Sequence, residues 1–185
     1  VSKGSSLDVE VQHRHKGKGR WLRMICEPVG DDIAATFVDI TDGKAKERQM
    51  ETIATSDPLT GVLNRRGFER DAAQRLTDSA DDATGALLFI DLNDFKQIND
   101  QYGHDVGDLF LKETAVLINK GVRDTDIVIR FGGEECFILL VDFNPGDAIL
   151  VAEKIRKIFD EAKIKFPNGS IQKTLSLGVS EFPGD

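Results

Sequence analysis

The sequence has few cysteines and no long hydrophobic run, and each shortage excludes a class of protein. With only Cys26 and Cys136 among 185 residues, a disulfide framework has no basis, which fits a reducing compartment. No apolar stretch approaches the roughly 20 residues that a membrane-spanning helix needs. There is no signal peptide and the chain begins at Val1, so we expect a piece excised from a longer protein.

Positive charge is also in deficit. The formal net charge of −8 at pH 7 argues against binding nucleic acid or acidic membranes through bulk charge. An acidic protein can still bind a phosphate ligand when a divalent cation lies between the two. The sequence has no internal repeat, no low-complexity tract and no G-x-x-x-x-G-K-[ST] phosphate loop. Its composition, 40% hydrophobic and 30% charged, is sufficient for a folded core.

Charge divides the chain into two regions. Residues 1–56 are neutral, with 9 Lys/Arg and 9 Asp/Glu, so the whole net charge lies in residues 57–185. Alternating runs in the first region predict three antiparallel strands, at 7–15, 21–29 and 33–40. Residues 42–56 then predict a helical connector with Asp42 as its N-cap.

The second region alternates helices with apolar strands, which predicts an α/β sheet with antiparallel pairing at one hairpin. Gly103 and Gly121 are expected to close the two middle helices, and Pro145 to open the last one. The expected elements are a helix ending near residue 77, a buried strand from 85 ending at Asp91, helices at 93–103 and 105–121, a hairpin at 127–141, a helix at 145–164 and a strand at 171–182.

The hairpin "IVIRFGGEECFILLV" carries two carboxylates, Glu134 and Glu135, at its tip. Gly132 and Gly133 tolerate a positive φ and leave room for phosphates, although a plain solvated turn has the same composition. Asp91 ends a buried strand, where it could instead cap the following helix. If that strand lies beside the hairpin, three carboxylates converge and need a cation, for which Mg²⁺ is suited.

Three motifs together, "DPLTGVLNRRGF", "IDLNDFKQINDQYGHDVGD" and "RFGGEEC", resemble the GGDEF family of diguanylate cyclases. The resemblance covers residues 57–185. It implies a fold of the α/β (α+β) class, related to polymerase palm domains and class III nucleotide cyclases, with a central mixed sheet, flanking helices and a signature hairpin carrying GGEEC. It further implies that a homodimer condenses two GTP molecules into cyclic di-GMP and two pyrophosphates, in the cytoplasm of a bacterium, with a parent protein that could be membrane-anchored.

The resemblance also implies roles for individual residues. Two Mg²⁺ or Mn²⁺ ions per active site would assist the in-line displacement. Which glutamate accepts the proton, and whether a general base is needed beside the metal, stays open. The implied residues are Asp91, the Leu92 carbonyl and Glu134 for metal, Glu134, Glu135 and Lys96 for catalysis, and Asn99, His104 and Asp108 for the substrate.

Three of these residues also have an ordinary structural interpretation. Lys96 could be a solvated helix lysine, His104 a structural histidine, and Asp108 a first-turn helix acid. Asp108 would favour GTP over ATP because a carboxylate accepts from the paired N1–H and N2–H₂ donors of guanine.

Two further features concern control and departure from the family pattern. Arg123 and Asp126 resemble the RxxD site that binds product and inhibits the enzyme; the alternative is an i,i+3 ion pair in a helix. Cys136 stands where the family usually has Phe, and losing that volume would cost about 2–4 kcal/mol if nothing refills it.

The two ends resemble parts of larger domains. Residues 1–42 resemble the last strands of a PAS sensor domain, residues 43–56 a helical linker, and the GGDEF region is expected to lack its terminal helix and strand. A catalytically silent receptor for cyclic di-GMP or GTP is the alternative function. We expect no nucleic acid partner and no direct membrane contact from this piece.

Overall fold

The computed structural model describes residues 6–15, 18–78, 84–143 and 146–183, and the chain divides into two compact units, Val1–Thr52 and Ile53–Asp185. The first unit is an antiparallel sheet in the order β1-β2-β3. The predicted strands are confirmed, and the core is thin: among the described residues of this unit, only Cys26 is a buried hydrophobic residue. The strands are β1 (Leu7–His15), β2 (Lys18–Val29) and β3 (Asp32–Asp39).

Helix α1 (Thr41–Thr55) is anchored to this first sheet by its opening residue. The Trp21 N–H donates a hydrogen bond to Thr41 Oγ1 (2.9 Å), and the Thr41 N–H donates to Asp39 Oδ1 (3.0 Å). The helix therefore begins one residue earlier than predicted, and Asp42 lies inside its first turn. The predicted N-cap role of Asp42 is wrong, because the carboxylate of Asp39 already accepts from the start of the helix.

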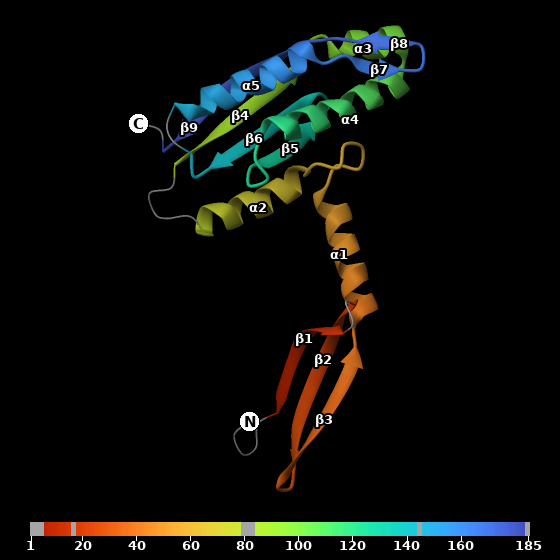
Figure 1. Ribbon diagram of the computed structural model, residues 1–185, viewed down its shortest axis with the longest axis vertical. Helices are drawn as coiled ribbons and strands as arrows, with labels where there is room; N and C mark the ends of the chain where they lie inside the picture. The colour runs from red at the N-terminus through yellow and green to blue at the C-terminus, as the bar shows by residue number, and fades with distance from the viewer. Residues whose placement is uncertain (1–5, 16–17, 79–83, 144–145, 184–185) are drawn as a thin grey trace. The chain divides into compact units, whose positions relative to one another are not determined.

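The second unit is built on a four-stranded sheet in the order β5-β6-β4-β9 (Figure 1). Its strand pairs are all antiparallel, and the parallel part is a single isolated bridge between Leu63 and Ile129. The predicted hairpin is confirmed, and the strand that carries Asp91 lies directly beside it. The strands are β4 (Gly85–Leu92), β5 (Ile127–Gly132), β6 (Glu135–Val141) and β9 (Leu175–Phe182).

Helices cover the two faces of this sheet unequally. Helices α4 and α5 pack on one face, whereas α2 packs on the other near β5 and Leu87 (Figure 1). Strand β4 alternates accordingly: its even-numbered residues from Ala86 to Leu92 are buried, while Phe89 and Asp91 on the other face are exposed. The helices are α2 (Arg65–Asp78), α3 (Phe95–Tyr102), α4 (His104–Gly121) and α5 (Asp147–Glu161).

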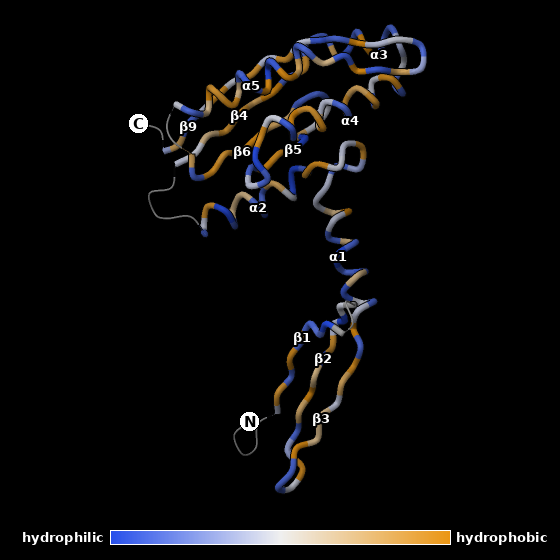
Figure 2. Tube along the Cα trace, viewed as in Figure 1, coloured by the Kyte–Doolittle hydropathy of each residue, from blue (hydrophilic) through white to orange (hydrophobic). Residues whose placement is uncertain are grey.

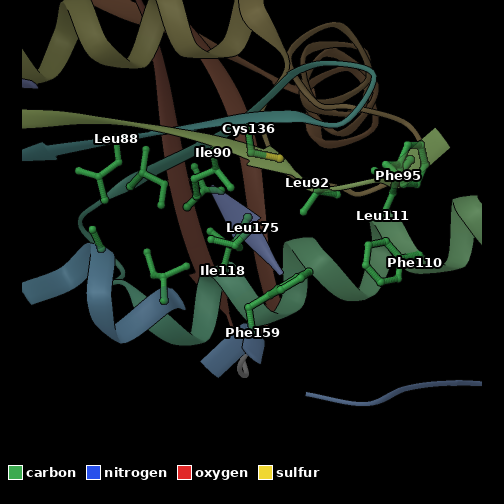
Figure 3. Packing of buried hydrophobic residues seen from close by; sticks show 14 of the residues in the cluster. Leu88, Ile90, Leu92, Phe95, Phe110, Leu111, Ile118, Cys136, Phe159 and Leu175 are labelled. Atoms are coloured by element: carbon green, nitrogen blue, oxygen red, sulfur yellow. The ribbon is translucent and has the colours of Figure 1, made fainter. Parts of the chain in front are cut away.

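The main core lies between the sheet and helices α3, α4 and α5 (Figure 3). Strands β4 and β6 are themselves largely hydrophobic, and polar and apolar residues alternate along α5, as an amphipathic helix on a sheet requires (Figure 2). Among the described helices, none is long and apolar enough to cross a bilayer. The most deeply buried large side chains of this core include Leu88, Ile90, Leu92, Ile98, Phe110, Ile118, Ile138, Leu140 and Ile155.

Several predicted element ends are wrong. Gly121 does not cap α4 but is its last residue, where an added Cβ would lie 2.6 Å from Ile155 Cγ1, so the glycine allows α4 to approach α5. The strand predicted at 171–182 is divided, because its first residue closes a small hairpin of β7 (Ile164–Phe166) and β8 (Gly169–Ile171). Pro145 lies outside the described residues, and α5 begins at Asp147.

Cys136 points into the main core, as predicted. Its residue is 4% exposed and lies opposite Ile90 on β4 and Arg130 on β5. Burial raises the pKa of its thiol to about 11. The side chain is therefore a small neutral hydrophobic group at neutral pH.

We expect Cys136 to react with iodoacetamide at pH 8 only as fast as the sheet opens, because almost no thiolate exists in the folded state. The rate can be measured by mass spectrometry in a Cys26→Ala variant, which leaves one thiol. The same protein in concentrated urea is the control and should be labelled rapidly. Labelling of the folded protein at the urea rate would contradict this burial.

Candidate active site

The tip of the β5–β6 hairpin is held by one arginine. Gly133 has φ 52°, so the turn uses the backbone freedom that glycine provides. Arg130 Nε and Nη2 both donate to the Gly133 carbonyl, at 3.0 and 2.8 Å. Its Nη1 donates to both carboxylate oxygens of Asp57, at 3.1 and 3.3 Å. The guanidinium thus ties the turn that carries Glu134 to the loop after α1.

Asp57 is itself fixed by a second set of hydrogen bonds. Its Oδ1 accepts from the Thr60 N–H (2.8 Å) and the Thr60 hydroxyl (2.7 Å). The Asp57 and Arg130 side chains are 17% and 14% exposed, so their ion pair is largely shielded from water. Burial alone would raise the pKa of Asp57, but the hydrogen bonds from Thr60 and Arg130 outweigh this effect and hold the pKa below its usual range.

The carboxylates meet across two strands. Asp91 on β4 lies directly opposite Glu135 on β6, and opposite Ser176 on β9. Side chains at paired positions share one face of the sheet, with Cβ atoms about 4.5–5.5 Å apart. Asp91 belongs to the strand and Asp94 precedes α3, so the alternative role of Asp91 as a helix cap is wrong.

Glu134 occupies the turn and is half-buried. The structure brings Asp91 and Glu135 together, but in the described part of the chain no group of three His, Cys, Asp or Glu side chains could hold a metal ion by itself.

The predicted substrate residues gather where α3 meets α4. Lys96 and Asn99 lie on α3, His104 begins α4, and Asp108 follows within the same helix. Asn99 is half-buried and the other three are exposed. Asp105, not Asp108, is the acid in the first turn of α4, so the structure gives no support to the first-turn interpretation of Asp108.

The seven polar side chains expected to work here share one property. Within the described residues, none of them makes a hydrogen bond or ion pair to another side chain, whereas Asp57, Asn64, Asn93 and Arg130 nearby are all hydrogen-bonded. The surrounding scaffold is therefore hydrogen-bonded internally, whereas these seven side chains keep their hydrogen-bonding capacity for a ligand. Those seven are Asp91, Lys96, Asn99, His104, Asp108, Glu134 and Glu135.

A shallow cavity of about 260 Å³ lies beside the carboxylates on the open face of the sheet. Phe89 and Phe137 form its aromatic wall, with ring centroids 4.1 Å apart. Asp91 and Glu135 line it as well, so this face combines negative charge with an apolar surface. A larger cavity of about 780 Å³ lies between α2 and the loop before β5 and contains none of the predicted catalytic residues.

Arg123 and Asp126 form a close ion pair (2.7 Å), but in the loop after α4 and not in a helix. Arg123 also donates to the Val141 carbonyl (3.3 Å) and lies over the Phe143 ring, 4.7 Å from its centroid. The hydrogen bond to Asp126 raises the pKa of Arg123, so its charge is permanent. A cavity of about 370 Å³ beside this pair is also lined by Lys154 of α5.

Sequence reasoning missed Arg130, Asp57 and Lys154. Asp57 belongs to the quoted "DPLTG" motif, but nothing in the sequence connects it with a residue 73 positions later. Lys154 reaches the Arg123 cavity only because α5 packs against the end of α4. A basic residue on a predicted surface helix carries no signal of that proximity.

The chain is similar to proteins of one family. The family described as diguanylate cyclase, GGDEF domain, matches residues 54–185. Diguanylate cyclase DgcM of Escherichia coli (strain K12) is 38% identical over 178 residues, which cover 91% of this chain and 42% of DgcM. The uncharacterized protein YhcK of Bacillus subtilis (strain 168) is 39% identical over 141 residues, covering 75% of this chain and 39% of YhcK. This chain spans less than half the length of these curated relatives.

Solved structures give the same result. Diguanylate cyclase SiaD from Pseudomonas aeruginosa, in complex with its activator SiaC, is similar with a TM-score of 0.66 and 31% identity, covering 76% of this chain and 54% of SiaD. The GGDEF domain of DgcB from Caulobacter crescentus, in complex with c-di-GMP, has a TM-score of 0.64 and 26% identity, covering 69% of this chain and 77% of that domain.

We expect Arg130→Lys to destabilise the second unit by about 1–3 kcal/mol, because a lysine cannot bridge the Gly133 carbonyl and the Asp57 carboxylate at once. Urea unfolding followed by circular dichroism measures this. Arg156→Lys is the matched control, since among the described residues Arg156 makes only an exposed pair with Glu153. Equal stability of the two variants would contradict the role of Arg130.

Because the folded-state pKa of Asp57 is depressed, its contribution to stability is present above its unfolded pKa and is lost as pH falls through the folded value. Asp57→Asn should therefore be less stable than the unmodified chain at pH 7, and the difference should shrink below pH 4. A difference that does not change between pH 7 and pH 3 would contradict this origin.

Proposed function

The chain belongs to the GGDEF family, and we propose that it is a diguanylate cyclase, which joins two GTP molecules into cyclic di-3′,5′-GMP and releases two pyrophosphates. The observation that carries the proposal is the pairing of Asp91 with Glu135 beside the Gly133–Glu134 turn, with all three carboxylates free of partners among the described residues. Carboxylates that lie close together without a positively charged side chain repel one another, so a role in stabilising the fold does not explain their placement.

The donor set suits a divalent metal that arrives with its substrate. Mg²⁺ is usually bound by one or two carboxylates, with waters and substrate phosphates completing its shell, and not by a dedicated protein cage. Asp91, the Leu92 carbonyl and Glu134 would hold Mg²⁺ or Mn²⁺, two ions per active site. When bound, such ions neutralise the triphosphate and favour ionisation of the attacking hydroxyl.

The residues of the chain divide the remaining work. Lys96 contributes a point charge for the triphosphate, and Asp108 accepts from the N1–H and N2–H₂ donors of guanine. Asn99 and His104 line the same nucleotide pocket.

In each half-reaction the 3′-oxygen of one GTP forms a bond to the α-phosphorus of the other. The bond from that phosphorus to the bridging oxygen breaks, pyrophosphate leaves, and the hydroxyl proton passes to a carboxylate, Glu134 or Glu135, or to water.

The reaction needs two copies of the chain. One copy offers one nucleotide pocket, so the second GTP must be presented by a partner facing Asp91. The open sheet face around Asp91 and Phe89, which α2 leaves uncovered, supports this arrangement because it leaves the carboxylates accessible.

Product would bind away from this face, at Arg123 and Asp126. The guanidinium is half-exposed while the Asp126 carboxylate is 2% exposed, so Arg123 is held in place yet can still reach a phosphate. The cavity with Lys154 adds a second cation suited to the second phosphate of a cyclic dinucleotide. The same geometry would serve a catalytically silent receptor, which would bind nucleotide without forming cyclic di-GMP.

We expect Glu134→Ala and Asp91→Asn each to lower the rate of cyclic di-GMP formation at least about 100-fold, because each removes a group that acts on the transition state. Chromatography of products after incubation with GTP and Mg²⁺ measures the rate. Asp100→Asn, an exposed α3 acid outside the site, should leave it unchanged. Undiminished turnover in Glu134→Ala would refute the site assignment, and a chain that binds nucleotide but forms no product would be the receptor.

Arg123→Ala should weaken inhibition by added cyclic di-GMP about tenfold or more while leaving the initial rate within about twofold, because the charge-assisted contacts to phosphate are lost away from the catalytic face. Inhibition curves for this variant, for Lys154→Ala and for the control Arg156→Ala decide the point. Equal inhibition of Arg123→Ala and the control would contradict a product site in this loop.

A further inference from the structure

We propose that Gly107 is a positioning residue for the guanine-reading amide of Asn99. This inference rests on the proposed function, since it concerns the nucleotide pocket of the cyclase. Gly107 lies in the first turns of α4, directly before Asp108, and is buried. Its own amide donates to the Gly103 carbonyl at 3.2 Å, so it takes part in the ordinary hydrogen bonding of the helix.

The missing side chain of Gly107 is what allows α3 and α4 to meet closely. A Cβ at this position would lie 2.0 Å from Asn99 Oδ1 and 3.0 Å from Asn99 Cγ, with the Phe95 ring next at 3.5 Å. Asn99 and Phe95 are one helical turn apart on α3, so both side chains pack against α4 at Gly107, where there is no side chain. The amide of Asn99 therefore occupies the space that any other residue at 107 would fill.

Asn99 depends on this packing because nothing else fixes its amide. Within the described residues its side chain makes no hydrogen bond, while its backbone carbonyl accepts from the Gly103 N–H (2.9 Å). A half-buried amide without an internal hydrogen-bond partner keeps its hydrogen-bonding capacity for a ligand. In this packing the amide oxygen of Asn99 lies against Gly107, the residue before Asp108, the other expected guanine reader.

The backbone of Gly107 does not itself require glycine. It is absent from the positive-φ residues among those described, and alanine forms helices better than glycine does. The atom that would clash is the end of a movable side chain, so Gly107→Ala should fold well and displace Asn99. Helix stability and nucleotide recognition should then change in opposite directions, which a merely structural glycine would not produce.

The test uses the 185-residue chain with Mg²⁺ and 3′-deoxy-GTP, which lacks the attacking hydroxyl and cannot turn over. By calorimetry, we expect Gly107→Ala to bind 3′-deoxy-GTP roughly tenfold more weakly, the loss expected for one hydrogen-bonding group. Its affinity for inorganic triphosphate, which has no base, should stay within about twofold. Its melting temperature should be equal to or above that of the unmodified chain.

Three further variants complete the test. Asn99→Ala should show the same loss, and the double variant no additional loss, because both changes remove one contact. Gly121→Ala is the matched control in the same helix: its Cβ would meet Ile155, so it should lower the melting temperature without changing the relative affinities for 3′-deoxy-GTP and triphosphate.

Several results would overturn the inference. Unchanged 3′-deoxy-GTP binding by Gly107→Ala, an additive loss in the double variant, or a melting temperature several degrees lower would each make the glycine a packing requirement only. Absence of 3′-deoxy-GTP binding in the unmodified chain would overturn the proposed function, and this inference with it.

Discussion

The carbonyl of Gly133 is the point on which the arrangement of the site depends. A two-residue turn at the end of a hairpin has no ladder partner for this oxygen, and two nitrogens of Arg130 supply one. Asp57 then neutralises the guanidinium, which the surrounding burial makes necessary. Through Asp57 the hairpin is connected to the segment that follows α1, where Asn64 donates to the Ala54 and Ser56 carbonyls. A change at the end of that helix therefore has a physical route to the turn that carries Glu134.

The site is made of two classes of polar group with opposite properties. Scaffold groups such as Asp57, Asn64 and Arg130 are hydrogen-bonded inside the protein, whereas the carboxylates and the α3–α4 residues have no such partners in the described part of the chain. The hydrogen bonds of the first class hold the backbone in place, and water competes little for them because the groups are largely buried. The second remains available because rigid strands and helices position it without using its hydrogen bonds. This division keeps recognition separate from stability.

Much of the fold could be predicted because burial of one face of a strand or helix sets the spacing of its hydrophobic residues. The apolar run before Asp91 and the hairpin around Gly133 are strands whose register follows from which face must be buried. Element ends were less predictable. Gly121 is the residue type that often caps a helix, yet here it is needed because Ile155 on another helix lies close to it. The Arg130–Asp57 pair and the approach of Lys154 to Arg123 were not predictable, since each joins residues that only the tertiary fold brings together. The carboxylates were found from their places at the hairpin tip and at the end of a buried strand, and the structure supplied the register that pairs Asp91 with Glu135 across β4 and β6.

The hydrogen bonds from Arg130 to the turn also fix the direction in which the peptide between Gly133 and Glu134 points. In a trans peptide the carbonyl and the following N–H point to opposite sides. With the Gly133 oxygen turned toward the guanidinium, the Glu134 N–H is turned away from it. The peptide between Gly133 and Glu134 thus has a fixed dipole, and its positive N–H end lies on the side away from Arg130. Arginine at position 130 determines the polarity of this end of the hairpin as well as its shape.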